Sequence, residues 1–280
     1  MTGWTAWRIV PSSERADAED ALEYLAEKGV VVTSREISRD GPWRIEIFGE
    51  GDRPMLAGSW TWEDLPDRDW VAENQRSFRP FQVGPFWIHP SHIRDGMAAG
   101  LLPIEIDAGM AFGTGTHATT RGCLEMLAAL DPAETVKAVD VGCGSGILAI
   151  AMAKLWRRPV LGGDNDAEAV DVAVENAEAN GVAALCRFVT SVGLQAQELA
   201  RHAPYDLIVA NILAGPLVEL SASFAPAVRP GGRVLLSGLL VEQAAMVLGA
   251  YEGHGFKLER RIELETSGDW WCSLVVRKAP

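Results

Sequence analysis

The feature that most constrains the fold is a glycine-rich turn at Gly142–Gly146. A largely apolar run, Val136–Val141, leads into this turn, and a helix-like apolar run begins at Ile147. Three glycines separated by single residues leave the turn almost bare of side chains, so a ligand can lie against its backbone. The sequence therefore predicts a strand, a tight turn and the start of a helix.

Beyond this turn, strand-like and helix-like segments alternate. The expected strands are Val160–Gly163, Arg187–Thr190, Tyr205–Ala210 and Val234–Ser237. The expected helices are Ile147–Leu155, Ala167–Asn180, Pro216–Val228 and Val241–Tyr251, with a turn at Pro230-Gly231-Gly232. Two strands, Phe256–Leu264 and Trp271–Arg277, then follow without a helix between them. The pattern predicts an α/β fold, with helices on both faces of a parallel sheet and an antiparallel edge strand at its end.

The first part of the chain has a different organisation. Residues 4–10 are strand-like, a helix is expected from Ser12 or Ser13 to Lys28, and Val30–Ser34 and Trp43–Phe48 are expected strands. These elements predict a small α+β domain over residues 1–62. The charged, proline-containing residues 63–75 are interpreted as a linker, and residues 76–280 as the second domain. Residues 78–108 fit no single period.

The glycine spacing distinguishes two classes of cofactor. Dinucleotide-binding turns follow the pattern GxGxxG, whereas this turn reads Gly142-x-Gly144-x-Gly146 and has Ile147 where the third glycine would stand. Asp140, just before the turn, is expected to repel a pyrophosphate. A cofactor with a cationic centre and no phosphate is therefore favoured. The alternative is a plain tight turn with no ligand.

Asp164 is the second candidate ligand-binding residue, because it ends the strand that follows the glycine turn. In doubly wound sheets, an acid at this place holds the two hydroxyls of a ribose. The alternative is that Asp164 caps the next helix, although Asp166 is better placed for that role.

Composition limits the partners and the compartment. The formal net charge is -13, which argues against nucleic acid and allows a basic protein or a cationic small molecule. The four cysteines are scattered, so neither a disulfide framework nor a metal site is indicated. No apolar run is long enough to cross a membrane, and the first residues do not resemble a signal peptide. We therefore expect a cytoplasmic protein, and nothing in the sequence requires more than a monomer.

Residues 109–278 resemble the class I S-adenosylmethionine-dependent methyltransferases. Three segments in order narrow the resemblance, namely AFGTGTHATT at 111–120, DVGCGSGILAIA at 140–151 and VANILAGP at 209–216. Together they are similar to the ribosomal protein L11 methyltransferase (PrmA) family. That family carries a seven-stranded Rossmann-like sheet with an antiparallel last strand. It also has a small N-terminal α+β substrate-recognition domain joined by a linker.

The resemblance implies a cofactor, a substrate and a set of contacts. The cofactor is S-adenosyl-L-methionine, and the acceptors are lysine side chains and the α-amino group of ribosomal protein L11, free or on the ribosome. The implied cofactor contacts are Thr120, Gly142, Asp164 and Asn211, with Phe112 and Gly144 lining the same pocket. Asn211 is also expected to orient the incoming amine, with no dedicated base required.

Other interpretations remain open at this stage. The same chemistry could act on another protein, such as the electron-transfer flavoprotein β subunit. A nucleotide-dependent oxidoreductase and a non-catalytic binding module are alternatives of other classes. His117 is expected to be solvated or structural, and Trp270 and Trp271 are expected to divide between the core and the surface of an edge strand.

Overall fold

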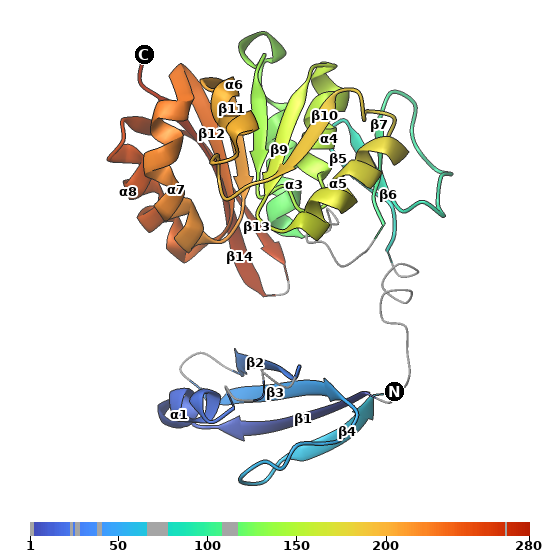
Figure 1. Ribbon diagram of the computed structural model, residues 1–280, viewed down its shortest axis with the longest axis vertical. Coiled ribbons are helices and arrows are strands. Elements are labelled where there is room, and N and C mark those ends of the chain that lie inside the picture. The colour runs from blue at the N-terminus through green and yellow to red at the C-terminus, as the bar shows by residue number, and fades with distance from the viewer. Residues whose placement is uncertain are drawn as a thin grey trace. The chain divides into compact units, whose positions relative to one another are not determined.

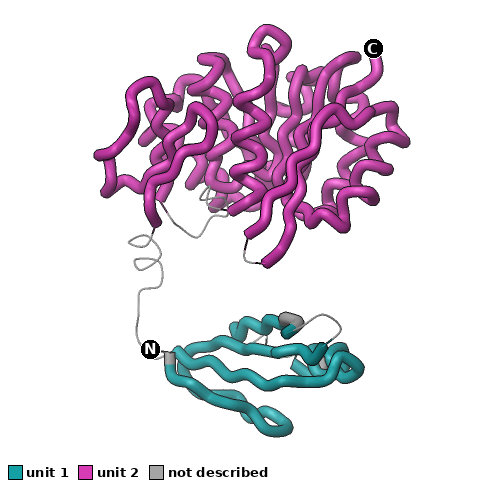
Figure 2. Tube along the Cα trace, turned by 180° about the vertical axis from the view of Figure 1, so that it is seen from behind, with its two compact units in different colours: residues 1–73 teal, residues 74–280 magenta. Residues whose placement is uncertain are grey.

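The computed structural model describes residues 3–22, 25, 29–37, 41–65, 78–107, 117–266 and 268–280. The chain divides into two compact units, residues 1–73 and 74–280, coloured separately in Figure 2. Each unit has its own apolar core, and each is described by itself below.

The N-terminal unit is an antiparallel sheet with the strand order β2-β3-β1-β4. Its strands are β1 Gly3–Val10, β2 Val31–Glu36, β3 Trp43–Glu50 and β4 Thr61–Leu65. Alternate residues of β1 and β3 point to one face, where Ala6, Ile45 and Ile47 are buried against Leu22 and Leu25. The small α+β domain therefore closes around a single apolar layer.

Two details of this unit differ from expectation. The helix expected from Ser12 or Ser13 begins as a 3-10 turn, Ser12–Glu14, and continues as α1, Arg15–Asp20. Neither serine caps α1, because the hydroxyl of Ser12 donates to the carbonyl of Gly41 instead. The expected linker begins too early, since Glu63–Leu65 pair with β1 as the end of β4. The remainder of the linker, residues 66–75, lies outside the described residues.

The C-terminal unit is built on a seven-stranded sheet with the order β10-β9-β8-β11-β12-β14-β13 (Figure 1). Its strands are β8 Ala138–Val141, β9 Val160–Asp164, β10 Cys186–Thr190, β11 Tyr205–Asn211, β12 Val228–Leu240, β13 Phe256–Thr266 and β14 Asp269–Lys278. The turn expected at Pro230-Gly231-Gly232 lies inside β12, near the point where its register with β11 shifts.

The antiparallel last strand is confirmed, but it is not the edge of the sheet. β14 inserts between β12 and β13 and is antiparallel to both, which leaves β13 at the edge. The burial of the two strands explains this order. Cys272–Val276 of β14 are buried on both faces, whereas β13 is exposed over residues 257–261 and alternates half-buried and exposed residues over 262–266.

Helices cover both faces of this sheet, as the alternation predicted. Their bounds are α3 Ala118–Ala128, α4 Ile147–Trp156, α5 Ala167–Ala179, α6 Gln197–His202, α7 Ala214–Ala227 and α8 Ala244–Glu252. One apolar cluster joins α3, α4 and α5 to the sheet, and a second joins α6, α7 and α8 to it. None of the helices in the described part of the chain is long and apolar enough to span a membrane.

A small three-stranded sheet precedes α3 and was not predicted. It consists of β5 Phe81–Val83, β6 Phe86–His89 and β7 Leu102–Glu105, in the order β5-β6-β7. Phe86, Ile88 and Ile104 are fully buried in the same cluster as α3 and α4. This small sheet therefore completes the apolar core on the face of the main sheet that α3, α4 and α5 cover.

Candidate active site

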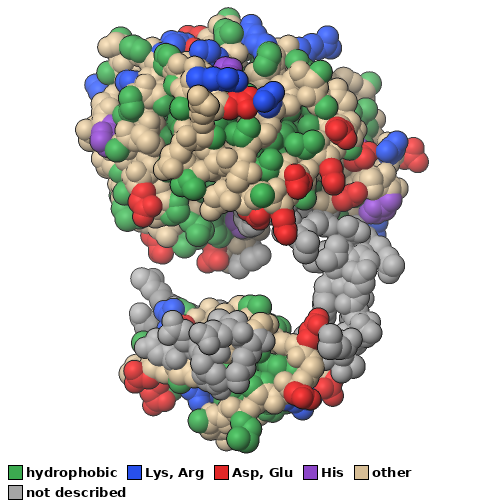
Figure 3. Space-filling model, in the orientation of Figure 1, with side chains coloured by type: hydrophobic (Ala, Val, Ile, Leu, Met, Phe, Trp, Pro, Cys, Tyr) green, Lys and Arg blue, Asp and Glu red, His purple; other side chains and the backbone are tan. Residues whose placement is uncertain are grey.

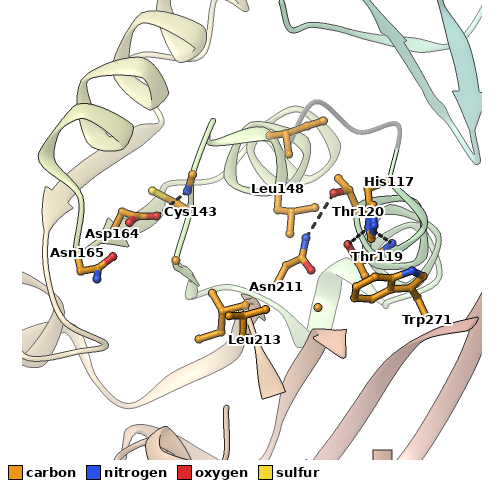
Figure 4. A pocket seen from close by; sticks show the side chains of 15 residues that line it. His117, Thr119, Thr120, Cys143, Leu148, Asp164, Asn165, Asn211, Leu213 and Trp271 are labelled. Atoms are coloured by element: carbon orange, nitrogen blue, oxygen red, sulfur yellow. Dashed lines mark hydrogen bonds between the residues drawn. The ribbon is translucent and has the colours of Figure 1, made fainter. Parts of the chain in front are cut away.

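A cavity of about 470 Å³ lies where β8, β9 and β11 end (Figure 4). This volume falls within the roughly 300–1,000 Å³ of typical small-molecule pockets. The carboxyl ends of parallel strands are the usual place for a ligand in such a sheet. The four residues expected to contact a cofactor, Thr120, Gly142, Asp164 and Asn211, all line this cavity, and so does Gly144.

The glycine turn forms one wall of the cavity. The backbone N–H groups of Gly142 and Cys143 donate to the carbonyl of Gly163 at 2.7 and 3.1 Å, which ties the turn to β9. Gly142 has a φ of 71°, and a Cβ placed there would stand 2.3 Å from Cγ2 of Ile212. Both the backbone conformation and the close approach therefore require glycine at this position.

Asp164 is buried at the end of β9 and is held by the turn beside it. One carboxylate oxygen accepts from the N–H of Gly144 at 2.8 Å, and the other accepts from the N–H of Asp166 at 3.1 Å. Each oxygen keeps acceptor capacity for a further donor. Asp166 caps α5 by accepting from the N–H of Glu168 at 2.9 Å, which confirms the helix-cap assignment.

Asn211 and Thr120 meet across the cavity although they are 91 residues apart in the chain. Nδ2 of Asn211 donates to Oγ1 of Thr120 at 3.4 Å. Oδ1 of Asn211 is buried and has no hydrogen-bond partner among the described residues. A buried acceptor without a partner costs about 1–3 kcal/mol, and such groups in native proteins are often functional.

Asp140 does not face the ligand, contrary to the expectation from the sequence. Its side chain is only 1 % exposed and is not part of the cavity lining. Oδ2 accepts from the N–H of Ala149 in α4 at 3.1 Å, and burial raises the pKa of Asp140 to about 8. The carboxyl is therefore largely protonated at neutral pH and repels nothing. The argument against a dinucleotide now rests on the spacing alone, because Ile147 begins α4.

His117 and Trp271 form the end of the cavity beyond Thr120 (Figure 4). His117 caps α3, with Nδ1 accepting from the N–H of Thr119 at 3.4 Å. Its ring meets the Trp271 ring edge to face, with centroids 4.6 Å apart. Burial lowers the pKa of His117. His117 thus has a structural role, as the cap of α3, and it also lines the cavity.

Sequence reasoning missed several lining residues, among them Trp271, Leu213 and Gly238. Leu213 follows Asn211 closely and is 71 % exposed, so the strand-end motif could have indicated it. Trp271 carries no local signal, because only the insertion of β14 beside β12 brings it to the cavity. Phe112 and the rest of 108–116 lie outside the described residues.

The strand order, the bare turn after β8 and the carboxylate that ends β9 define a class I S-adenosylmethionine-dependent methyltransferase. The model of the ribosomal protein L11 methyltransferase (PrmA) family matches residues 12–279. The chain belongs to this family, and its cofactor is S-adenosyl-L-methionine.

Relatives of this chain are found among both sequences and structures. A ribosomal protein L11 methyltransferase of Brucella abortus (strain S19) is 38% identical over 273 residues, which cover 92% of this chain and 96% of the relative. The namesake of Rhizobium meliloti (strain 1021) is 47% identical over 71% of this chain and 69% of its own. The crystal structure of a ribosomal protein L11 methylase from Lactobacillus delbrueckii subsp. bulgaricus covers 72% of this chain and 100% of its own, with a TM-score of 0.62 and 27% identity.

The residues of the cavity fit this cofactor. The backbone at Gly142 and Gly144 is open to a flat or extended ligand, and Asp164 offers acceptors for hydroxyl groups. Most of the remaining lining is apolar, including Ile147 and Leu148. An apolar wall with a few placed polar groups is typical of a small-molecule site.

Proposed function

We propose that this protein transfers methyl groups from S-adenosyl-L-methionine to amino groups of ribosomal protein L11, on lysine side chains and on the α-amino group. The observation that supports an amine acceptor is Asn211, a cavity-lining residue at the end of β11 whose Oδ1 is buried and has no hydrogen-bond partner among the described residues. When bound, the cofactor supplies a methyl group attached to a positively charged sulfur.

Each of the four expected contact residues is assigned to a different part of the cofactor. We assign Asp164 to the ribose hydroxyls, since both its oxygens already lie fixed at the turn. Gly142 lets the backbone approach the ligand closely. We assign the hydroxyl of Thr120, at the start of α3, to the amino-acid end of the cofactor, because the partial positive charge of a helix N-terminus favours a carboxylate. Asn211 joins the two regions.

An amine must be neutral to accept a methyl group. For a lysine with a pKa near 10.4, deprotonation near pH 7.4 costs roughly 4 kcal/mol. Apolar walls lower this cost, because burial disfavours the ammonium form. Leu213 and Trp271 supply such walls next to Asn211. Alignment by Asn211 Oδ1 can contribute several kcal/mol more, so the cavity can act without a dedicated base.

The charge distribution supports a cationic acceptor. The net charge of the chain is -13. On the face of the C-terminal unit that Figure 3 shows, most acidic side chains lie in the lower half, towards the end at which the β13–β14 hairpin is seen in Figure 1. The hairpin itself presents exposed Glu265 and Asp269. A surface of this sign attracts a lysine-rich protein and raises its association rate.

Asn211→Ala tests the central assignment. We expect methylation of ribosomal protein L11 to fall at least tenfold, because the variant loses the acceptor that orients the amine. Thr120→Val is the matched variant, since it removes only the hydroxyl bonded to Asn211. Turnover and calorimetric cofactor affinity are measured for both. If Asn211→Ala keeps wild-type turnover and wild-type cofactor affinity, the assignment is wrong.

We further propose that the N-terminal unit recognises the protein substrate through the open face of its sheet. This face, opposite the buried layer, carries Trp7, Phe48 and the exposed side chains of Ile9 and Val31. The alternation along the strands places these side chains on one face. Arg44 lies on the same face, where it stacks on the Trp7 ring and pairs with Glu46. Aromatic rings, arginine and exposed aliphatic side chains on one surface are typical of a protein-binding surface.

The full chain with Ile9→Glu and Val31→Glu tests this recognition role. We expect KM for ribosomal protein L11 to rise about tenfold or more while cofactor affinity stays unchanged, because the charges disrupt an apolar contact. Val136→Glu is the matched control in the C-terminal unit, since Val136 and Val31 are both 58% exposed. An unchanged KM in the double variant would exclude this face.

We also propose that the protein acts in the cytoplasm as a monomer. Light scattering can check the oligomeric state.

A further inference from the structure

The cavity has two apolar walls around the acceptor position. In Figure 4 the amide of Asn211 lies between the side chain of Leu213 and the indole ring of Trp271. Leu213 belongs to the loop that follows β11, and Trp271 belongs to β14. Leu213 is 71 % exposed, so this wall reaches the opening of the cavity. An acceptor chain that reaches Asn211 passes between these two side chains.

The chemistry of the acceptor changes with every methyl group it receives. A primary ammonium offers three N–H donors, and each methylation replaces one of them with a methyl group. The hydrogen bond to Asn211 Oδ1 can therefore hold the early acceptor but has nothing to hold in a fully methylated nitrogen. The partly methylated amine presents methyl groups instead, and an aromatic ring offers them an apolar surface.

We propose that Trp271 contacts the methyl groups of the neutral, partly methylated acceptor amine and so determines how many methyl groups one nitrogen receives. Asn211 then positions the unmethylated amine, and Trp271 positions the amine that already carries methyl groups. This division rests on the amine acceptor of the proposed function. Trp271 is a positioning residue. Its contribution to the rate grows with each successive methyl transfer, while that of Asn211 declines.

The surroundings of Trp271 suit this role. Its ring is oriented by the edge-to-face contact with His117, at an interplanar angle of 76°. His117 is itself fixed as the cap of α3 through Thr119. Burial lowers the pKa of His117, which favours its neutral form beside the amine. The histidine and the indole ring therefore form an end wall that the methyl groups of the acceptor can contact.

The neighbouring tryptophan provides an internal comparison. Trp270 points to the opposite face of β14, because successive side chains of a strand alternate. It is 57 % exposed and does not line the cavity. The same substitution at Trp270 and Trp271 therefore separates a role in the site from a general effect on the hairpin.

The test follows the methylation of ribosomal protein L11 by mass spectrometry for full-length wild type, Trp271→Leu, Trp271→Phe and Trp270→Leu. For Trp271→Leu, which keeps an apolar wall but removes the ring surface, we expect the first transfer within about threefold of wild type and the later transfers slowed on the order of tenfold, so that monomethylated product accumulates. Trp271→Phe should be intermediate, because it retains a ring. Trp270→Leu should match wild type.

Equal slowing of all transfers in Trp271→Leu, or a wild-type distribution of products, would overturn the inference. A second measurement separates it from the proposed function. The protein saturated with S-adenosylhomocysteine is titrated with a lysine peptide and with its trimethylated form. If wild type methylates no amine, the proposed reaction is wrong. The titration then tests by itself whether Trp271 binds the methylated form of the lysine. A preference for the trimethylated peptide that Trp271→Leu loses supports the inference, and a preference that it keeps overturns it.

Discussion

Replacing Asp140 by asparagine should stabilise the C-terminal unit, and more so as the pH rises. Asp140 is 1 % exposed, and its Oδ1 has no hydrogen-bond partner among the described residues. Its Oδ2 accepts from the N–H of Ala149 at 3.1 Å. An asparagine carbonyl can keep this hydrogen bond, and the amide cannot ionise. The substitution therefore removes the titration and leaves the shape almost unchanged.

The magnitude follows from the pKa of this carboxyl. Burial raises the pKa from 3.8 to about 8 in the folded protein. Because the folded value is the higher one, the stability that this group contributes is fully present below pH 3.8 and is lost as the pH rises through about 8. The loss is about 1.4 kcal/mol per pH unit, or on the order of 4 kcal/mol by pH 7. The new Nδ2 group, buried without a partner, costs about 1–3 kcal/mol, so Asp140→Asn gains on the order of 2 kcal/mol at pH 7.

The cysteines allow the C-terminal unit to be followed alone. All four lie in this unit and are buried, namely Cys123, Cys143, Cys186 and Cys272. A disulfide reagent that stays reactive in acid, such as dithiodipyridine, therefore reports its unfolding in urea without interference from the N-terminal unit. Wild type and variant are compared at the same pH, so that differences in thiol reactivity cancel.

The decisive quantity is the slope of the stability difference with pH. Between pH 5 and 7 the gap between Asp140→Asn and wild type should widen by about 1.4 kcal/mol per pH unit, and it should level off above the folded pKa. Asp171→Asn, at an exposed position of α5, controls for the loss of one negative charge. A gap that stays constant across this range would refute the reasoning, because it would mean that the carboxyl titrates alike in the folded and unfolded chain.

Two further substitutions test the wall of the cavity. Gly142→Ala should lower cofactor affinity more than tenfold and destabilise the unit by on the order of 2–3 kcal/mol, because its Cβ would stand 2.3 Å from Ile212 Cγ2. Gly181→Ala, which also has a positive φ but no atom within 4 Å of the new Cβ, should cost only about 1–2 kcal/mol and leave affinity unchanged; equal effects would contradict the steric argument. Asp164→Asn should weaken cofactor binding roughly tenfold to a hundredfold in a calorimetric titration, since it loses charge-assisted hydrogen bonds; an unaltered affinity would remove Asp164 from the ribose site.

Elements with strong local signals could be predicted from the sequence. The spacing of the glycines at Gly142–Gly146 was enough to predict a tight turn, and all three have a positive φ. The alternation of segments after this turn predicted the parallel sheet and the helices on its two faces. Asp166 was identified as a cap because capping depends on the next three residues only. The strand-end positions of Asp164 and Asn211 followed from the same local pattern, since parallel strands end at one edge of a sheet.

Features that depend on distant partners could not be predicted. The strands of residues 81–105 are short and carry no clear period, so their pairing and their place against α3 and α4 appear only in the folded chain. The same holds for β14, whose buried residues draw it between β12 and β13 and bring Trp271 to the cavity. Sequence spacing gives no measure of such contacts.

Asp140 shows the difference most clearly. Its residue type and its place before the glycine turn were evident in the sequence, and they suggested a charge that faces the ligand. Its direction and its burial depend on the packing of α4 against β8, which turns the carboxyl away from the cavity and raises its pKa. Local patterns determine which backbone conformations a segment adopts. The solvent exposure of a side chain, and with it its charge, is determined by segments that come together only when the chain folds.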